Sequence, residues 1–392
     1  MDASNFVRTG QRHRWAVAAL FLMNGFLSGS WAPQIPEFVT RLDISKVTLG
    51  LLILLFGVGA VVAMPWSGYL MSRHGSRKVV LAFAIFAAFG LFFVAASPNV
   101  LVAAVAMFVF GGLIGGMDVA MNANAVVVER HMSRAIMSSS HAFWSLGGFF
   151  GGTIGGVAIQ NFGHLVHAIG VTAVALAIFA YAARSVIADK APPRHEHHRS
   201  ALPKSPTVYL VGLMALFSMI PEGAVLDWAA LYLKQERGTD LATAGLAFGL
   251  FAGAMAVMRF LGDGVRNRLG AVKTLRISAL IAAAGMLVAG LSSNVWVAIA
   301  AFAVTGIGIA NVVPIIFSAG GNQPGMASTT GMSVVTTMGY SGILLAPSAI
   351  GFTAEHTGFS VVFVAMSALL VVVCLMGNLA HAADFDHNKP AA

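Results

Sequence analysis

The sequence predicts an all-α membrane protein with twelve transmembrane helices arranged as two six-helix bundles. Three observations support this prediction: the composition, the length and spacing of the apolar segments, and a repeat that relates the two halves of the chain. Of the 392 residues, 58% are hydrophobic and only 10% are charged, a balance far from that of soluble domains. Long apolar runs in such a chain are expected to cross a membrane.

Twelve segments each offer about 20 mostly apolar residues, enough to cross the hydrocarbon core as a helix. Backbone polar groups in lipid must be satisfied within the segment, whereas barrel strands would be shorter and would alternate in polarity. No small-residue cleavage site follows the first segment, so we expect it to be a retained span. The expected spans are 14–37, 47–71, 78–96, 100–128, 136–160, 164–186, 207–233, 241–264, 272–291, 295–318, 328–350 and 358–381.

The lysines and arginines predict the orientation of these spans. Eighteen of the 23 fall on the side that holds both termini, and only Arg41, Lys46, Lys234 and Arg237 fall on the opposite side. Positively charged loops are retained in the cytoplasm, so we expect both termini there. The basic residues are scattered and form no patch with stacking aromatic residues, which argues against nucleic-acid binding.

The two halves of the chain repeat each other at a spacing of 195 residues. Parallel halves of this kind are typical of transporters in which one half rocks against the other around a site at mid-membrane. We expect an N-terminal bundle over 1–187, a cytoplasmic linker over 188–206 and a C-terminal bundle over 207–392. Matching pairs include Gly50 and Gly245, Gly75 and Gly270, Asn99 and Asn294, Gly111 and Gly306, and Gly163 and Gly358.

One loop signature recurs in both halves. The loop between spans two and three reads GYLMSRHGSRK over 68–78, and its partner reads RFLGDGVRNRLG over 259–270. Together with the repeat, these loops resemble the major facilitator superfamily, whose pattern there is G-x-L-x-D-R-x-G-R-K/R. The resemblance covers the whole chain and implies a multi-pass secondary transporter of the bacterial inner membrane.

The two loops depart from that pattern at the acidic position, which holds Ser72 in one and Asn267 in the other. Asp263 lies one helical turn from Arg259, so a pair between these two residues would replace the missing acid. We expect the loop charges to act as a gate, with a role in topology alone as the alternative. The expected gating residues are Arg73, Arg77, Glu129, Arg134, Arg259, Asp263 and Arg268.

Ionisable residues inside the fourth and fifth spans mark a transport path, because such groups are costly in lipid unless they face a bundle interior or water. Asp118, Asn122 and Glu129 fall on one stripe of the fourth span. If the two spans form a hairpin, His141 comes level with Asn122 and Asn124. We therefore expect a carboxylate, two amides and an imidazole in one cavity wall, with structural hydrogen bonding or packing as the alternative role.

The seventh span supplies a second set of acids. Pro221 and Gly223 weaken the helix around Glu222 at about mid-depth, which suits a site lined by water and solute. Asp227 lies farther toward the outer end. The aromatic residues beside it, Trp228 and Tyr232, offer faces that stack on solutes, and an aromatic belt at the membrane interface is the alternative.

These acids break the repeat, because Asp118 corresponds to Val313 and Glu222 to Leu27. Scaffold residues would recur, so function is the simpler explanation for charges that do not. The expected substrate- and proton-binding residues are Asp118, Asn122, Asn124, His141, Glu222, Asp227, Trp228, Tyr232, Trp31, Gln34, Asn311 and Tyr340.

Four stretches give a narrower resemblance, to the bacterial MosC and YbjJ group: SGSWAPQIPEF at 28–38, MDVAMNANAVVVE at 117–129, SSHAFWSLGG at 139–148 and EGAVLDWAALYL at 222–233. MosC is associated with a rhizopine, an amino-inositol ether, so the resemblance implies a sugar-like or polyol-like solute. We expect alternating access with proton coupling, as in a symporter. The glycine run over 147–156 resembles the antiporter motif of drug exporters, with Gly152 in place of its proline, so drug export is the alternative.

Other classes receive less support from the sequence. It contains no HExxH motif, no paired nucleophile and base, and no phosphate-binding loop, so we expect neither an enzyme nor a cofactor. A non-transporting sensor would carry a signalling domain, and the termini here are short. The histidine tract at 195, 197 and 198 is expected to be solvated, with metal binding as the less favoured alternative. Expected partners are a small solute, protons and the lipid bilayer, with the chain as a monomer.

Overall fold

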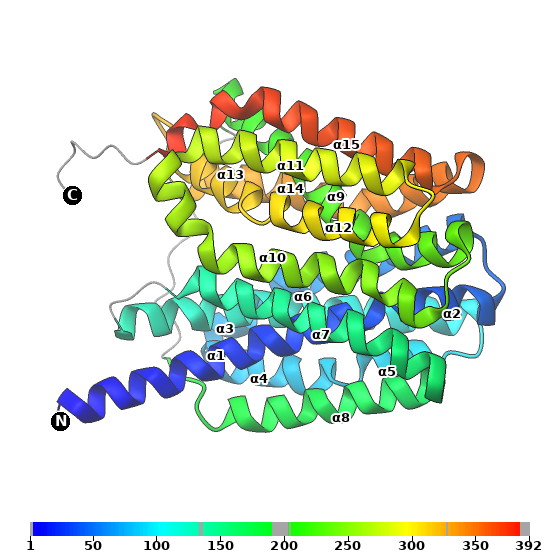
Figure 1. Cartoon of the computed structure of the whole chain (residues 1–392). Helices are drawn as coiled ribbons and strands as arrows, with labels where there is room; N and C mark the ends of the chain where they lie inside the picture. Colours follow the sequence, from blue (N-terminus) through cyan, green and yellow to red (C-terminus); the bar gives the residue numbers. More distant parts are fainter. Residues whose placement is uncertain (1–2, 133–135, 190–202, 204, 327, 385–392) are drawn as a thin grey trace.

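The computed structural model describes residues 3–132, 136–189, 203, 205–326 and 328–384 (Figure 1). Within these ranges the chain forms helices and no strands. The elements are α1 (Ala3–Trp31), α2 (Gln34–Leu42), α3 (Lys46–His74), α4 (Ser76–Ala87), α5 (Gly90–Ala95), α6 (Val100–Met132), α7 (Met137–Phe162), α8 (His164–Ala183), α9 (Pro206–Arg237), α10 (Leu241–Leu269), α11 (Ala271–Leu291), α12 (Val295–Ile309), α13 (Val312–Gly321), α14 (Ser328–Thr357), α15 (Phe359–Leu375) and the 3-10 helix η1 (Met376–Ala383).

The predicted all-α membrane fold with twelve spans is confirmed. In the described part of the chain, 11 segments are long and apolar enough to cross a membrane, and the pair α1 and α2 makes a twelfth although it bends by 43°. Pro33 lies at this bend, where a proline cannot donate the hydrogen bond that would continue α1. Three other spans also consist of paired helices: α4 with α5, α12 with α13, and α15 with η1.

The helices lie side by side as two groups, α1–α8 and α9–η1, which we call the first and second halves (Figure 1). The two ends of the chain lie at the same end of the molecule, which we call the terminal end. Helix α2 lies at the opposite end, which we call the distal end. The halves pack against each other chiefly through α7 on α10 and α3 on α14.

The turns of the two halves match at the predicted spacing. Gly75 and Gly270 both have φ of 78°, and Gly163 and Gly358 have φ of 83° and 84°. Glycine adopts this left-handed backbone without the steric cost that a Cβ would bring. The repeat in the sequence is therefore a repeat of backbone conformation.

Close helix packing also repeats. A Cβ on Gly111 would lie 1.9 Å from the carbonyl oxygen of Phe56, and one on Gly306 would lie 2.2 Å from that of Phe251. Residues without a side chain let helix backbones approach this closely in membrane proteins. These contacts fix α6 against α3 in the first half and α12 against α10 in the second.

Two acids hold the loops that lack the expected aspartate. Asp189 accepts hydrogen bonds from the backbone N–H of Ser76 at 2.8 Å, and Asp384 accepts from that of Ala271 at 2.5 Å. The two contacts occupy equivalent places at the starts of α4 and α11, where the first backbone N–H groups have no partner within the helix. Each carboxylate lies just after the last helix of the half whose helix start it holds. The local sequence around the loops gives no sign of either contact.

Candidate solute-binding site

Polar side chains from both halves converge near the middle of the spans. In the first half, Asp118 and Asn122 lie one turn apart on α6, as the polar stripe predicts. The Asn122 amide donates to Asp118 Oδ1 at 3.3 Å and to the Asp118 carbonyl oxygen at 2.9 Å. The partner of this acid is therefore a neutral amide on its own helix.

In the second half, Glu222 of α9 pairs with Arg259 of α10. Arg259 Nη2 lies 3.3 Å from Glu222 Oε1, and the two side chains are only 12% and 22% exposed. Arg259 also donates to Ser145 Oγ on α7 at 2.7 Å, which links the two halves. Arg259 thus belongs to the central cluster. The side chain of Asp263 lies outside the described residues, so the predicted pair of Arg259 with Asp263 stays a prediction.

Tyr340 of α14 closes the cluster. It lies close enough to Asp118 and Glu222 to interact electrostatically with both, although these acids belong to different halves. Its exposed fraction is 41%, and Asp118 and Glu222 are themselves partly exposed. We call Asp118, Asn122, His141, Glu222, Arg259 and Tyr340 the central cluster.

His141 on α7 belongs to the cluster, whereas Asn124, which was predicted to lie beside it, faces other neighbours. The His141 ring lies edge-on to Phe21 at 5.1 Å and interacts electrostatically with Arg259. Asn124 is fully buried, and its amide donates to Ser76 Oγ at 2.8 Å and to the Ile187 carbonyl at 3.1 Å. Residues two apart on a helix point about 200° from each other, which is why Asn122 and Asn124 face different neighbours.

Asp227 lies on the distal side of the cluster, between the halves. It is 8% exposed, and Trp31 of α1 lies close enough to interact with its carboxylate. Trp31 also packs edge-on against Phe38 at 5.3 Å. The two predicted site residues therefore contact each other across the interface, away from Asp118 and Glu222.

Trp228 and Tyr232 are packing residues in this structure. Both are fully buried, which is incompatible with an aromatic belt at the membrane interface. Tyr232 donates to the Ala289 carbonyl at 2.8 Å and accepts from Arg237 at 2.6 Å. Hydropathy alone does not show which face of α9 is buried, and for this reason the sequence suggested a binding role.

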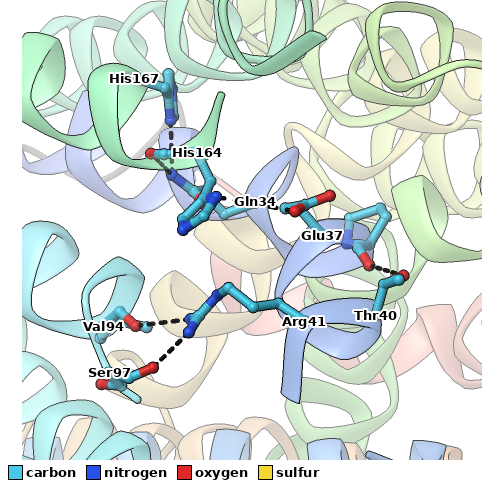
Figure 2. A network of polar contacts seen from close by, with 9 residues as sticks. Gln34, Glu37, Thr40, Arg41, Val94, Ser97, His164 and His167 are labelled. Carbon is cyan, nitrogen blue, oxygen red and sulfur yellow. Dashed lines mark hydrogen bonds and ion pairs between the residues drawn. The ribbon is translucent and has the colours of Figure 1, made fainter. Parts of the chain in front are cut away.

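Gln34 ties the bent helix α2 to α8 (Figure 2). Its amide donates to the His164 carbonyl at 2.9 Å and to His167 Nδ1 at 2.8 Å. Figure 2 also shows Glu37 facing His164; their side chains are 3.8 Å apart. Arg41 donates to two backbone carbonyls, one in the last turn of α5 and one just after it. A cavity of about 340 Å³ borders this network at the distal end and is lined in part by Glu37 and His164. Gln34 thus acts within the first half.

Asn311 lies at the break between α12 and α13. It is 7% exposed, and a Cβ on Gly262 would fall 2.0 Å from its Oδ1. Its Nδ2 atom has no hydrogen-bond partner among the described residues. The structure therefore packs Asn311 tightly against α10.

The predicted gating residues at the terminal end act separately. Glu129 accepts from the backbone N–H groups of Ile136 and Met137 at 2.7 and 3.0 Å, so it caps the start of α7. The Arg73 guanidinium lies 4.8 Å from the centre of the Tyr69 ring on its own helix. Two further arginines, Arg77 and Arg268, are exposed, and Arg134 lies outside the described residues.

No metal centre is found in the part of the chain that the structure describes, since no three histidine, cysteine or acidic side chains gather there. The histidine tract at 195, 197 and 198 lies outside the described residues. Sequence reasoning also missed Ser145, which joins the cluster through Arg259. A serine in a helix is too common to signal such a role.

Comparison with known proteins agrees with this architecture. The family model for the Major Facilitator Superfamily matches residues 17–323 and 211–387. An MFS-type transporter of Yersinia pestis is 34% identical, over 94% of this chain and 95% of its own. The membrane protein MosC of Rhizobium meliloti is 31% identical, over 91% of this chain and 88% of its own.

Solved structures share the fold at low sequence identity. A mutant of the nucleoside transporter NupG matches with a TM-score of 0.76 at 12% identity, covering 94% of this chain and 99% of that one. The fucose:proton symporter FucP of E. coli matches with a TM-score of 0.63 at 17% identity, covering 94% and 98%. With duplicated halves, twelve spans and relatives over nearly its whole length, this chain belongs to the Major Facilitator Superfamily and is a membrane transporter.

Proposed function

We propose that this transporter moves a small hydrophilic solute by alternating access, coupled to protons, and that the central cluster binds the solute. One observation carries the proposal: three polar residues of the first half and three of the second meet near the middle of the spans. A site shared by both halves is what a rocking mechanism requires, because the solute must lose contact with one side before it gains the other. Its residues are Asp118, Asn122, His141, Glu222, Arg259 and Tyr340.

The chemistry of the cluster favours a solute rich in hydroxyl groups, with or without an amine. Asp118 and Glu222 accept hydrogen bonds from hydroxyl or ammonium groups, while Arg259 and Asn122 donate to solute oxygens. Sugars, polyols and amino-inositols offer both kinds of group. The nucleoside transporter and the fucose:proton symporter with this fold carry solutes of comparable polarity, which supports testing these classes first.

Two of the acids have neutral partners, which supports proton coupling. Asp118 contacts the neutral amide of Asn122, and Asp227 contacts the neutral indole of Trp31. A buried carboxylate without a cationic partner pays a large desolvation cost when charged, and a proton removes that cost. Asp227 also lies between the halves, so separation of their distal ends would expose it to the outer solution.

The test is uptake into proteoliposomes, with and without a pH gradient, across sugars, inositols, amino-inositols and nucleosides. An inward proton gradient is expected to accelerate uptake of one class. Asp118→Asn and Asp227→Asn are expected to abolish that acceleration. The proposal is wrong if flux ignores the gradient and survives both substitutions.

Proton-driven export of amphiphilic drugs is the second candidate, favoured by the glycine run over 147–156. In the structure the glycines of this run face two neighbouring helices. A Cβ on Gly152 would lie 2.8 Å from the backbone nitrogen of Gly249 on α10, and one on Gly151 would lie 2.6 Å from the backbone nitrogen of Ser30 on α1. Close packing of α7 on both helices therefore accounts for the run without a drug site. A growth-inhibition panel separates the candidates, because loss of a polyol carrier leaves drug tolerance unchanged.

A further inference from the structure

Two side-chain caps join the halves at the distal end. Glu355 at the end of α14 accepts from the backbone N–H of Lys46 at 2.9 Å. Gln160 at the end of α7 accepts from the backbone N–H of Ala242 at 3.0 Å. In each case a side chain of one half caps the first turn of a helix in the other half.

The two caps are counterparts in the repeat. Gln160 and Glu355 are 195 residues apart. Their donors are the first residue of α3, Lys46, and the second residue of α10, Ala242. Backbone N–H groups in the first turn of a helix have no partner within it, and a side-chain oxygen that accepts from them stabilises the helix start. The same device therefore appears twice, related by the pseudo-symmetry of the fold.

Tight backbone contacts lie beside both caps. A Cβ on Gly156 would lie 2.4 Å from the carbonyl oxygen of Leu241, and one on Gly351 would lie 2.4 Å from that of Lys46. With the backbones this close, the halves cannot separate at the distal end without breaking the two capping bonds.

The two caps differ in charge. Glu355 brings a carboxylate to the start of α3, where the helix dipole favours negative charge, whereas Gln160 is neutral. Lys46 adds to the first cap, because its Nζ donates to the Ala354 carbonyl at 3.0 Å and lies 4.8 Å from the centre of the Phe359 ring. The cap on α3 is thus the stronger of the two.

We propose that Gln160 and Glu355 form a two-point latch that holds the transporter closed at its distal end, with Glu355 as the stronger point. Opening of that end releases two helix starts to water, and closing caps them again. The inference rests on the proposed alternating access, but it needs no knowledge of the solute.

Glu236 provides a matched control. Its carboxylate accepts from the backbone N–H of Phe359, the first residue of α15, at 2.5 Å. As in the latch, a side-chain oxygen accepts from the backbone N–H at the start of a helix. Here, however, both residues belong to the second half. Removing this cap affects the stability of one half and leaves the contact between the halves intact.

The experiment measures how fast a buried cysteine reacts with a small thiol reagent in the purified full-length protein. The native thiol is removed by Cys374→Ser, and the reporter is Ala252→Cys, since Ala252 is buried and faces Gly148 across the α7–α10 contact. A second reporter, Ala279→Cys, is buried inside the second half and reports global unfolding.

Glu355→Ala is expected to raise the reaction rate at Ala252→Cys about threefold to tenfold, the effect of one net hydrogen bond on the open population. Gln160→Ala is expected to raise it less, and the double substitution to multiply the two effects. Because the reporter lies on α7–α10, an effect of Glu355 on α14 reflects movement of whole halves. Glu355→Gln keeps a hydrogen-bond acceptor, so its reaction rate is expected to lie between those of the parent and Glu355→Ala.

Three results would overturn the latch. The double variant could react at the parent's rate, Glu236→Ala could accelerate the reporter as much as Glu355→Ala, or Ala279→Cys could accelerate equally and reveal unfolding. These readouts differ from that of the flux assay. A protein that carries none of the tested solutes can still show the latch, and a proton-coupled carrier can lack it.

Discussion

The two six-helix halves share their turns and helix caps but differ in their central polar side chains. Asp189 and Asp384 hold equivalent helix starts, whereas Asp118 corresponds to Val313 and Arg259 to Met64. A duplicated scaffold needs the same turns in both halves in order to fold. A solute without two-fold symmetry needs different groups on its two sides, so the comparison separates folding residues from binding residues.

The largest expected effect tests the shared packing. Gly111→Val and Gly306→Val each place side-chain atoms where a neighbouring backbone carbonyl lies about 2 Å away. We expect each to lower the free energy of unfolding in detergent by about 3 kcal/mol, the upper range for an overpacked core. Tolerance of the substitution in one half alone would break the structural equivalence of the halves.

The second prediction tests the unshared residues. Asp118→Asn and Glu222→Gln each remove a charged hydrogen-bonding group, so solute affinity is expected to fall about tenfold or more. Unfolding of Asp118→Asn in detergent should change little, because Asp118 contacts the neutral amide of Asn122. Glu222→Gln is expected to lower stability as well, because it removes the carboxylate that pairs with Arg259. Conservative changes at the equivalent positions, Val313→Ile and Leu27→Met, serve as controls and should leave solute affinity at the parent's value.

A smaller effect distinguishes the two shared acids. Asp189 accepts from the backbone nitrogens of Ser76 and Arg77 and from Ser76 Oγ, whereas one hydrogen bond to Asp384, from Ala271, is seen. Asp189→Ala is expected to cost about 2 kcal/mol of stability and Asp384→Ala about 1 kcal/mol. Thermal unfolding measures both, and a reversed order would contradict the role of the additional donors.

The smallest expected effect is the loss of one helix cap at low pH. The backbone N–H of Thr243 donates to Asp240 at 2.7 Å and lowers the pKa of that carboxyl. A carboxyl with a lowered folded pKa stabilises the protein above its unfolded pKa, and this contribution is lost as the pH falls through the folded value, below about pH 4. At the equivalent position in the first half, Ser45 Oγ accepts from the backbone N–H of Thr48 at 3.1 Å. A serine hydroxyl does not change its charge in this pH range.

Hydrogen exchange at these two amides measures the difference. Protection of the Thr243 amide, corrected for intrinsic rate, is expected to fall relative to that of Thr48 between pH 6 and pH 3. Equal loss of protection at both amides would indicate general acid unfolding and would contradict a role for the Asp240 carboxylate.

Helices and repeat could be predicted from the sequence because both depend on local patterns. Apolar length gave the spans, and glycines at matching positions marked turns that need a positive φ. The stripe of Asp118 and Asn122 was also predicted, since residues four apart share a helix face. These inferences needed no knowledge of which helices are neighbours.

Contacts between distant segments could not be predicted in this way. The bond from Ser76 to Asp189 joins residues 113 apart, and no periodicity indicates it. Pairing of Arg259 with Glu222 depends on how α9 meets α10. Burial of Trp228 and Tyr232 likewise depends on which face of α9 is turned inward, and an apolar helix does not reveal that face.

The most direct test of the central claim is the thermal stabilisation that a transported solute gives to the purified protein. Binding to the folded state alone raises the apparent melting temperature. The parent and Asp189→Ala are expected to show this rise, the latter from a lower starting temperature, whereas Asp118→Asn and Glu222→Gln are expected to lose it. An undiminished rise in both central variants would contradict the assignment of solute binding to the central cluster.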